Sequence, residues 1–471
     1  MIPSERPKDE CGVFGLYRHP EAAKITYFGL YALQHRGQES AGISVHRETD
    51  GQISSHKGMG LVPDIFKMED LERMEGGSAI GHVRYSTTGD SVLANAQPFV
   101  VRHRNKTYAL AHNGNLVNAH ILRRELEEKG SIFQTTMDSE VFLHMFIRSL
   151  AGGDFEQALR QAAERVEGAY SMVLLTSRGE VIGIKDPNGF RPLALGKLNG
   201  HYVLASETCA FDLIQAEFIR ELDPGEIVII KEDGIKSLRH PKAAAKKSMC
   251  IFEYIYFARP DSTIDGSNVY QMRKAHGRRL AQEAPVEADL VMPFPDSGNY
   301  AAIGYAEESG IPFEMGMIRN HYVGRSFIQP TQSMRDFAVR VKLNPVKELI
   351  KGKDIIIIED SIIRGTTAKT RVAALRELGV GKVHMRISCP PHRFPCYYGI
   401  DFSSRGELIA AQKSVEELRE HLGLDSLAYL SIEGMLEASG RENPEQHFCK
   451  ACFDGNYPVP FDPNFSKTCM G

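Results

Sequence analysis

Short apolar runs, many of them alternating with polar residues, recur through the first half of the chain. SAGISVH, AIGHVRYS, TYALAHNG, YSMVLLT, HYVLASE and EIVIIK each have the length and composition of a β-strand. Residues 155–167 instead repeat apolar positions at helical spacing. One stripe of this helix carries Phe155, Leu159, Ala162 and Val166. Strands grouped apart from helices predict an α+β domain of layered sheets.

The second half has a different pattern, in which predicted apolar strands alternate with predicted helices. Strands are predicted at 289–295, 354–360 and 382–388, and a helix at 367–378. This order is typical of a parallel sheet that is covered on both faces. The second half is therefore predicted to form an α/β domain.

Length and composition agree with two domains. The chain has 471 residues, too many for one ordinary hydrophobic core, and its 42% hydrophobic and 25% charged residues are typical of a globular protein. A polar, lysine-rich stretch at 236–248 separates the two patterns. The expected parts are a prefix of residues 1–10, a first domain of 11–240, and a second domain of 250–471 that includes a cysteine-bearing C-terminal extension.

Charge and hydropathy argue against several classes of partner. The net charge is only −4 and no long basic run occurs, so nothing points to a nucleic acid. The sequence contains no run of about 18 apolar residues, which is the length needed to span a bilayer. The prefix also lacks the apolar segment of an export signal, so a cytoplasmic location is expected. Eight cysteines over this length do not form a disulfide scaffold, which leaves them as core residues, nucleophiles or metal ligands.

The sharpest motif of the second half is IIIIEDSIIRGTTAKT. Four isoleucines predict a buried strand, and open α/β sheets bind ligands at the carboxyl ends of such strands. Glu359 and Asp360 emerge there, and the turn that follows could cradle a phosphate on free helix amides. The acids could hold ribose hydroxyls or magnesium. Alternatively they end the strand in solvent, and Thr366 or Thr367 only caps the helix.

As a whole, this string resembles the phosphoribosyl pyrophosphate (PRPP) signature of the type I phosphoribosyltransferases. Upstream, PFPDSGNYAAIGYAEESG resembles the pyrophosphate loop of that family, and the long polar stretch between the two motifs resembles a lid. The resemblance assigns PRPP binding to Asp296, Ser297, Gly298, Arg325, Arg340, Lys342, Glu359, Asp360, Arg364, Gly365, Thr366 and Thr367. It also implies Mg²⁺ near Ser297, Glu359 and Asp360. Family members often carry two aspartates where this chain has Glu359-Asp360, although related enzymes have Glu-Asp.

Cys11 follows a polar prefix and opens a strand-like run, KDECGVFGLY. By itself it would be a small buried apolar residue. LQHRGQESAGI, GHVRYSTTG, AHNGNL and TTMDSE, however, together resemble the class II glutamine amidotransferases, whose nucleophile is an N-terminal cysteine. The resemblance therefore implies that the prefix is a propeptide, removed by cleavage between Glu10 and Cys11. A free α-amine could then accept the thiol proton, which an amide nitrogen cannot do.

The same resemblance assigns the remaining roles of amide hydrolysis. The Asn113 side chain and the Gly114 amide correspond to the oxyanion hole, and Arg84 and Asp138 would bind the α-carboxylate and α-ammonium of glutamine. Arg36 and Tyr85 are expected to line the same pocket. Each residue has a structural alternative: a hairpin turn at Asn113-Gly114, a helix cap at Asp138 and a surface ion pair at Arg84. The histidines beside these motifs, His35, His82 and His112, are interpreted as packing or hydrogen-bonding groups.

Four further cysteines form a candidate metal centre. CKAC near the C-terminus could be half of a zinc site, a redox motif or half of an iron–sulfur site. One branch of the family carries a [4Fe–4S] cluster in such contexts, and the matching cysteines are Cys250, Cys396, Cys449 and Cys452. Cys389 competes with Cys396. The two remaining cysteines are interpreted as a core residue, Cys209, and a tail thiol, Cys469.

Together the resemblances imply an N-terminal-nucleophile (αββα) domain followed by a phosphoribosyltransferase domain. The implied enzyme hydrolyses glutamine to glutamate and transfers the ammonia to PRPP, giving 5-phosphoribosylamine and pyrophosphate, the first committed step of purine synthesis. An ammonia passage between the sites, inhibition by purine nucleotides and a homodimer or homotetramer are further implications. The alternatives are a PRPP-binding regulator without catalysis and another class II amidotransferase. A PRPP-binding regulator would not explain Cys11. Other class II amidotransferases carry a sugar-isomerase or ATP-binding domain, and the motif EDSIIRGTT argues against both.

Overall fold

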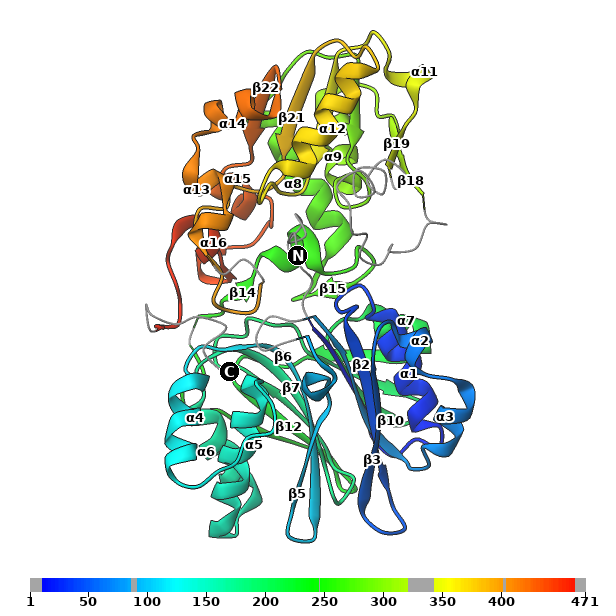
Figure 1. Ribbon diagram of the computed structural model, residues 1–471, viewed down its shortest axis with the longest axis vertical. Coiled ribbons are helices and arrows are strands. Elements are labelled where there is room, and N and C mark those ends of the chain that lie inside the picture. Colours follow the sequence, from blue (N-terminus) through cyan, green and yellow to red (C-terminus); the bar gives the residue numbers. More distant parts are fainter. Residues whose placement is uncertain (1–10, 86–90, 245, 321–342, 401–403, 462–471) are drawn as a thin grey trace.

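The computed structural model describes residues 11–85, 91–244, 246–320, 343–400 and 404–461. Four residues with predicted roles, Arg325, Arg340, Lys342 and Cys469, lie outside these ranges, as does the prefix. Figure 1 shows two bodies stacked along the long axis, with the first half of the chain below and the second half above.

The first domain contains two antiparallel sheets. The first sheet has the strand order β11 (Glu217–Glu221), β9 (Ala194–Leu198), β10 (His201–Ala205), β1 (Gly12–Leu16), β4 (Ser78–Arg84), β2 (Ser40–Arg47) and β3 (Gln52–Met59). The second has the order β13 (Gly234–Arg239), β12 (Glu226–Lys231), β8 (Val181–Lys185), β7 (Gly168–Thr176), β6 (Lys106–Leu116) and β5 (Phe99–His103). The six apolar runs singled out in the sequence coincide with β2, β4, β6, β7, β10 and β12.

The two sheets pack face to face, with helices on both outer faces. Val13 and Ile80 of the first sheet meet Ala111 and Val173 of the second in one fully buried cluster. Outside the first sheet lie α1 (Ala22–Ala32), α2 (Val62–Ile65), α3 (Met68–Arg73) and α7 (Cys209–Ile214). Outside the second lie α4 (Ala119–Glu128), α5 (Asp138–Ser149) and α6 (Phe155–Arg165). This confirms the αββα arrangement.

The second domain is built on a parallel sheet with the order β17 (Leu290–Pro293), β20 (Ile355–Glu359), β21 (Val383–Ile387) and β22 (Ser426–Tyr429). Every residue of β17, β20 and β21 is buried, which requires cover on both faces of the sheet. Its longer helices are α8 (Val269–Glu283), α9 (Asn299–Ser309), α12 (Thr366–Glu377) and α14 (Val415–Leu422). The predicted parallel-sheet domain is confirmed.

Short elements join this sheet to the first domain and to the C-terminal segment. They are β14 (Met249–Cys250), a π-helical turn (Glu253–Phe257), β15 (Thr263–Ile264), β16 (Ser267–Asn268), β18 (Met317–Arg319), β19 (Leu343–Pro345), α11 (Lys347–Ile350), α13 (Ile409–Gln412), α15 (Ile432–Glu437), β23 (Phe448–Cys449) and α16 (Ala451–Asp454). The core of the second domain continues into the first through Val117, Ala169 and Phe190. The domains therefore share buried apolar contacts.

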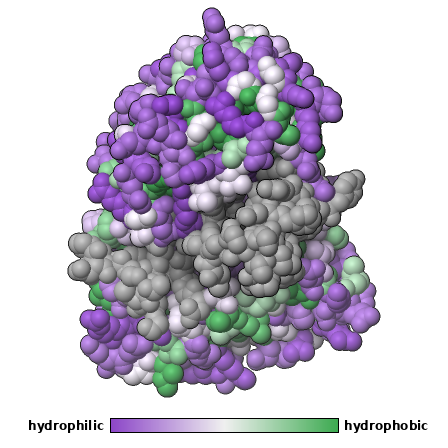
Figure 2. Space-filling model, turned by 45° about the horizontal axis from the view of Figure 1, so that its top comes forward, coloured by the Kyte–Doolittle hydropathy of each residue, from purple (hydrophilic) through white to green (hydrophobic). Residues whose placement is uncertain are grey.

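One face of the molecule is largely polar where its residues are described. Figure 2 shows hydrophilic residues over most of the coloured surface that it presents, with apolar residues in small separate groups. Of the helices in the described part of the chain, none combines the length and apolar character needed to cross a membrane.

Candidate active sites

Cys11 lies directly before β1, in the interior of the first domain. β1 pairs antiparallel with β4, with Gly12 opposite Val83, so that Cys11 comes beside Arg84 at the end of β4. The thiol is buried and donates a hydrogen bond of 3.4 Å to the Tyr85 carbonyl. The predicted nucleophile, Arg84 and Tyr85 are thus brought together.

The environment of Cys11 keeps its thiol protonated. Burial raises the pKa of Cys11 to about 11, although Tyr85 and Arg84 act in the opposite direction. Only a very small fraction of such a thiol is ionised near neutral pH. A nucleophile at this position therefore requires a neighbouring base.

Asn113 and Gly114 belong to the long strand β6 and not to a hairpin turn. Gly114 has a φ of +140°, and a side chain there would overlap the Ala169 carbonyl oxygen on β7, so only glycine fits. Asn113 is buried, and neither polar atom of its side chain has a hydrogen-bond partner within the described residues. A buried amide held without a partner can bind a ligand oxygen.

Arg84 and Asp138 place opposite charges beside the thiol. Both are buried, and the Cys11 pKa is lowered by the first and raised by the second. Asp138 begins α5, whose N-cap is Met137, so it is not the predicted helix cap. Burial raises the Asp138 pKa, but His112 and the Leu116 amide outweigh it and hold the carboxyl below its ordinary value. An adjacent cation and anion suit the two charges of an amino acid.

Arg36 has a buried role that the sequence did not indicate. Its Nε donates to the Cys11 carbonyl at 3.0 Å, and its two terminal nitrogens bind Glu207 and Glu253 at 2.6–2.9 Å. Its described contacts thus hold the main chain of the predicted nucleophile. His35 also binds Glu207, and burial lowers the pKa of His82 to about 3, so that His82 stays neutral.

In the second domain, the two predicted PRPP loops lie against each other at the carboxyl ends of β17 and β20. Asp296, Ser297 and Gly298 connect β17 to α9. A side chain at Gly298 would overlap the Ile358 carbonyl oxygen, so this glycine lets the loops approach closely. The Ser297 hydroxyl donates to Glu359 at 3.3 Å. Hydroxyl and carboxylate oxygens here match the ligands that Mg²⁺ prefers.

The two acids at the end of β20 are both buried and have different partners. Glu359 accepts from Arg371 on α12 at 3.1 Å, and Asp360 accepts from the Ser361 hydroxyl at 2.9 Å. The Arg371 guanidinium also stacks 4.8 Å from the centre of the Phe294 ring. Arg371 was not singled out from the sequence, where only its spacing of twelve residues from Glu359 could have indicated it.

The turn that follows has the geometry of an anion cradle. Gly365 is the N-cap of α12 with a φ of +81°, so neither Thr366 nor Thr367 is the cap. Both threonines lie in the first helical turn, whose amides are not used within the helix. Arg364 at the start of the turn is paired with Glu407, a second partner that the sequence did not indicate.

Four cysteines line one small cavity between the domains. Cys250 and Cys449 are opposite each other in the parallel β14–β23 pair, and Cys396 and Cys452 complete the lining. Burial raises the pKa of Cys452 well above its ordinary value, and the thiols of Cys250, Cys396, Cys449 and Cys389 act in the same direction. Cys389 is buried but does not line this cavity. In the described residues, no three His, Cys, Asp or Glu side chains are arranged to hold a metal ion.

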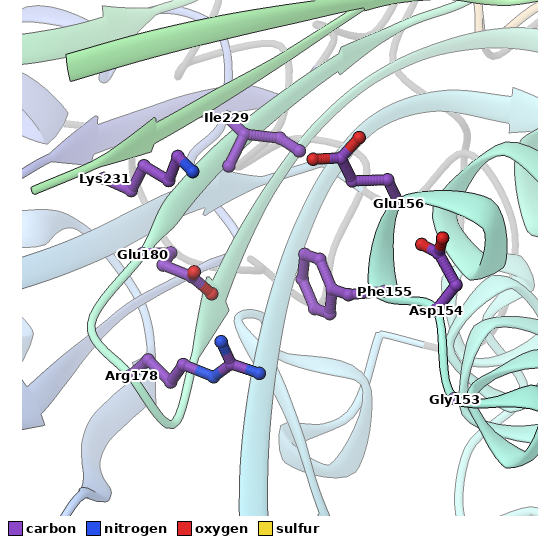
Figure 3. Close-up of a pocket in the computed structure, with 8 residues that line it drawn as sticks. All are labelled: Gly153, Asp154, Phe155, Glu156, Arg178, Glu180, Ile229 and Lys231. Atoms are coloured by element: carbon purple, nitrogen blue, oxygen red, sulfur yellow. The ribbon is translucent and has the colours of Figure 1, made fainter. Parts of the chain in front are cut away.

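A separate open pocket of about 540 Å³ lies at the start of α6 (Figure 3). It is lined by Gly153, Asp154, Phe155, Glu156, Arg178, Glu180, Ile229 and Lys231. Its charges are partly paired, since Glu156 binds Lys236 at 2.6 Å and Asp154 caps α6. None of the predicted site residues lines it.

Comparisons with known proteins agree with this pair of sites. A family model described as a glutamine amidotransferase domain matches residues 82–212. The amidophosphoribosyltransferase of Bacillus subtilis (strain 168) is 49% identical over 96% of this chain and 94% of its own length. That of Synechococcus elongatus is 52% identical over 98% and 94%.

Solved structures give the same result. The glutamine PRPP amidotransferase from B. subtilis, complexed with ADP and GMP, superposes with a TM-score of 0.91 at 47% identity, covering 98% of this chain and 100% of that one. A structure described as the allosteric regulatory enzyme of purine biosynthesis matches with the same score and identity, over 98% of each chain. With half of its residues shared over nearly its whole length, the chain belongs to the amidophosphoribosyltransferase family.

Proposed function

We propose that this protein hydrolyses glutamine at Cys11 and transfers the ammonia to PRPP at the end of β20, giving 5-phosphoribosylamine, glutamate and pyrophosphate. One observation carries the proposal: the same chain holds a buried thiol in the field of both Arg84 and Asp138 and a Gly365 turn after two buried acids. The first arrangement suits an amino acid amide, and the second suits a phosphorylated ribose. The reaction is the first committed step of purine synthesis.

In the first centre, removal of residues 1–10 frees the α-amine of Cys11. This amine, with an ordinary pKa of about 7.7–8.0, takes the thiol proton, and the sulfur attacks the side-chain carbonyl of glutamine. The Asn113 amide and the Gly114 N–H stabilise the resulting oxyanion. The C–N bond then breaks, ammonia leaves with a proton from the α-ammonium, and water hydrolyses the thioester to glutamate.

In the second centre, Asp296, Ser297 and Gly298 bind the pyrophosphate side of PRPP, and the turn from Arg364 to Thr367 binds its 5′-phosphate. Glu359 and Asp360 face the ribose. Mg²⁺, held with Ser297, Glu359 and Asp360, would neutralise the pyrophosphate leaving group. Ammonia attacks C1 as pyrophosphate departs, so the protein contributes positioning and charge and no proton transfer. Arg325, Arg340 and Lys342 complete the predicted PRPP set.

The four cysteines of the cavity are the proposed ligands of an iron–sulfur cluster, although in the described residues their side chains do not form a ligand set for a metal ion. Four thiols from β14, the Cys396 loop and the C-terminal segment line one apolar space, and a [4Fe–4S] cluster takes one thiolate on each iron. Cys250, Cys396, Cys449 and Cys452 would hold it. When bound, it would supply a covalent tie between the C-terminal segment and the rest of the second domain.

Regulation by purine nucleotides is proposed from the relatives. The B. subtilis enzyme was solved with ADP and GMP, and a second structural relative is described as allosteric. A homodimer or homotetramer is proposed for this chain, to be measured by mass in solution.

The decisive experiment supplies glutamine, PRPP and Mg²⁺ and measures glutamate and pyrophosphate in the same samples. Equal amounts of the two products are expected. The variant Cys11→Ala should form pyrophosphate only when ammonia is added. Binding of PRPP without pyrophosphate release under both nitrogen sources would instead identify a regulator, and glutamate formation that PRPP leaves unchanged would identify an unlinked glutaminase.

A further inference from the structure

The first centre is held in place from the second domain by two sets of contacts. One set involves Glu253, in the turn after β14. Its carboxylate binds both terminal nitrogens of Arg36, at 2.8 and 2.9 Å, and Arg36 in turn binds the carbonyl oxygen of Cys11. The side chains of Arg36 and Glu253 are completely buried. A second-domain carboxylate is therefore two hydrogen bonds from the main chain of the nucleophile.

The other set involves the segment from Tyr397 to Gly399, directly after the cluster cysteine Cys396. The Asn115 side chain donates to the Tyr397 carbonyl at 2.7 Å. The Cβ that a side chain at Gly399 would add lies 3.4 Å from the Gly114 backbone, so this segment packs on the strand that carries the oxyanion donors.

Arg191 of the first domain links the two sets. Its Nη1 lies 3.4 Å from the Glu253 carboxylate, and its Nη2 donates to the Tyr398 carbonyl at 2.5 Å. The Arg191 side chain is also completely buried. The buried side chains of Arg36, Glu253 and Arg191 thus form a network that connects the Cys11 carbonyl to the Tyr398 carbonyl. The adjacent Tyr397 carbonyl accepts from Asn115 on the strand of Asn113 and Gly114.

Such a network is expected to set geometry more than stability. Burying charges removes them from water, and their mutual attraction offsets that cost only when the geometry is good. Amide hydrolysis, in contrast, depends steeply on geometry, and a displacement of about 1 Å can lower the rate about a hundredfold.

We propose that Glu253 and Asn115 are positioning residues of the glutaminase centre. Glu253 sets the main chain of Cys11 through Arg36, and Asn115 sets the strand of Asn113 and Gly114 against the second domain. The first centre is incomplete without the second domain. This inference rests on the proposed roles of Cys11, Asn113 and Gly114.

The test compares Glu253→Gln and Asn115→Ala with two matched controls. Glu226→Gln weakens the pair of a buried carboxylate with the partly exposed Arg220, held by two bonds of 2.7 Å inside the first domain. Asn118→Ala removes a side-chain amide that donates to the Arg165 carbonyl at 2.9 Å, also inside the first domain. For each variant we would measure kcat and KM for glutamine, the rate with ammonia, and the rate at which a diazoketone analogue of glutamine alkylates Cys11.

For Glu253→Gln and Asn115→Ala, we expect kcat with glutamine and the alkylation rate to fall about tenfold to a hundredfold. The ammonia-dependent rate should stay within about twofold, and so should all rates of the controls. A role in stability alone would lower the glutamine and ammonia rates together. If Glu253→Gln does not fold, the rates of Asn115→Ala alone test the proposal.

Unchanged kcat and alkylation in a folded Asn115→Ala variant would overturn the inference, as would equal losses in the matched controls. Failure of the proposed function has a different signature. In that case the parent enzyme itself would not be alkylated at Cys11, or Cys11→Ala would retain glutamine-dependent activity.

Discussion

The residue that best separates function from stability is Asn113. Its amide is buried with no hydrogen-bond partner among the described residues. Leaving a buried polar group unsatisfied costs about 1–3 kcal/mol. A protein retains such a group where a ligand completes the hydrogen bonds, and in the proposed mechanism that ligand is the oxyanion formed from glutamine. The free energy of unfolding is then lower than it would be with a satisfied amide, which is a cost to stability that the proposed catalytic role explains.

Asn113→Ala is expected to lower kcat with glutamine about 10²–10³-fold, because one oxyanion donor is lost. The ammonia-dependent rate should not change, and the melting temperature should hold or rise, because the unsatisfied amide is gone. Steady-state kinetics with both nitrogen sources and thermal unfolding would check this. Full glutamine-dependent activity in the variant would remove Asn113 from the mechanism.

Motif residues could be predicted at this scale, but their partners could not. Cys11, Arg84 and Asp138 belong to sequence motifs that resemble those of a known family, and the structure brings the three residues together. Glu253 and Arg36 are 217 positions apart, and Asn115 and Tyr397 are 282 apart. Hydrogen bonds over such separations depend on how the domains dock, and no local pattern carries that information.

At the scale of elements, the strands and helices that local periodicity predicted agree with the structure to within a residue or two. β20 covers Ile355–Glu359 within the predicted 354–360, and α6 ends at Arg165 within the predicted 155–167. β6 shows the limit. Asn113-Gly114 has the sequence of a hairpin turn, yet β6 continues, because Gly114 pairs with Tyr170 and Leu116 with Gly168 of β7. Long-range pairing overrides the turn preference.

The C-terminal segment is the element whose stability would gain most from the proposed metal centre. Its described link to β14 is a strand pair of two residues, Cys250 with Cys449 and Met249 with Phe448, which is too short to be stable by itself. The four cysteines of the cavity lie around this pair. Their ligation would therefore supply much of the stability of the segment.

The purified protein is expected to be brown, with about four irons per chain for a [4Fe–4S] cluster. Cys452→Ser should lose the broad visible absorption, and proteases should cut residues 443–461 faster. The control Cys389→Ser alters a buried thiol that does not line the cavity, and its spectrum should not change. A colourless parent protein with bound zinc and full activity would contradict the cluster assignment.

At the scale of the whole molecule, the two centres are joined through the protein interior. Arg273 on α8 is buried and donates to the carbonyls of Tyr254, Tyr256 and Ala258 at 2.8–2.9 Å. These residues belong to or adjoin the turn that carries Glu253. Burial lowers the Arg273 pKa, whereas Asp360 at the predicted PRPP site raises it. The Arg273 side chain thus contacts the turn next to the glutaminase centre and is also within the electrostatic field of the predicted PRPP site.

This arrangement predicts that Arg273 transmits occupancy of the PRPP site to the glutaminase. A lysine has one charged nitrogen in place of a planar fork and cannot hold all three carbonyls in the same geometry. In the proposed coupled reaction, saturating PRPP is expected to increase glutamate formation, and in Arg273→Lys this increase should shrink severalfold. The ammonia-dependent rate at saturating PRPP should change less.

The matched control is Arg386→Lys, because Arg386 is another buried arginine of the second domain that donates to main-chain carbonyls, those of Ala284 and Met385. Its loss should lower the melting temperature without changing the stimulation by PRPP. If both lysine variants reduce stimulation equally, general loosening of the second domain explains the effect. If Arg273→Lys leaves the stimulation intact, coupling does not pass through the Glu253 turn, and the two centres communicate elsewhere in the molecule.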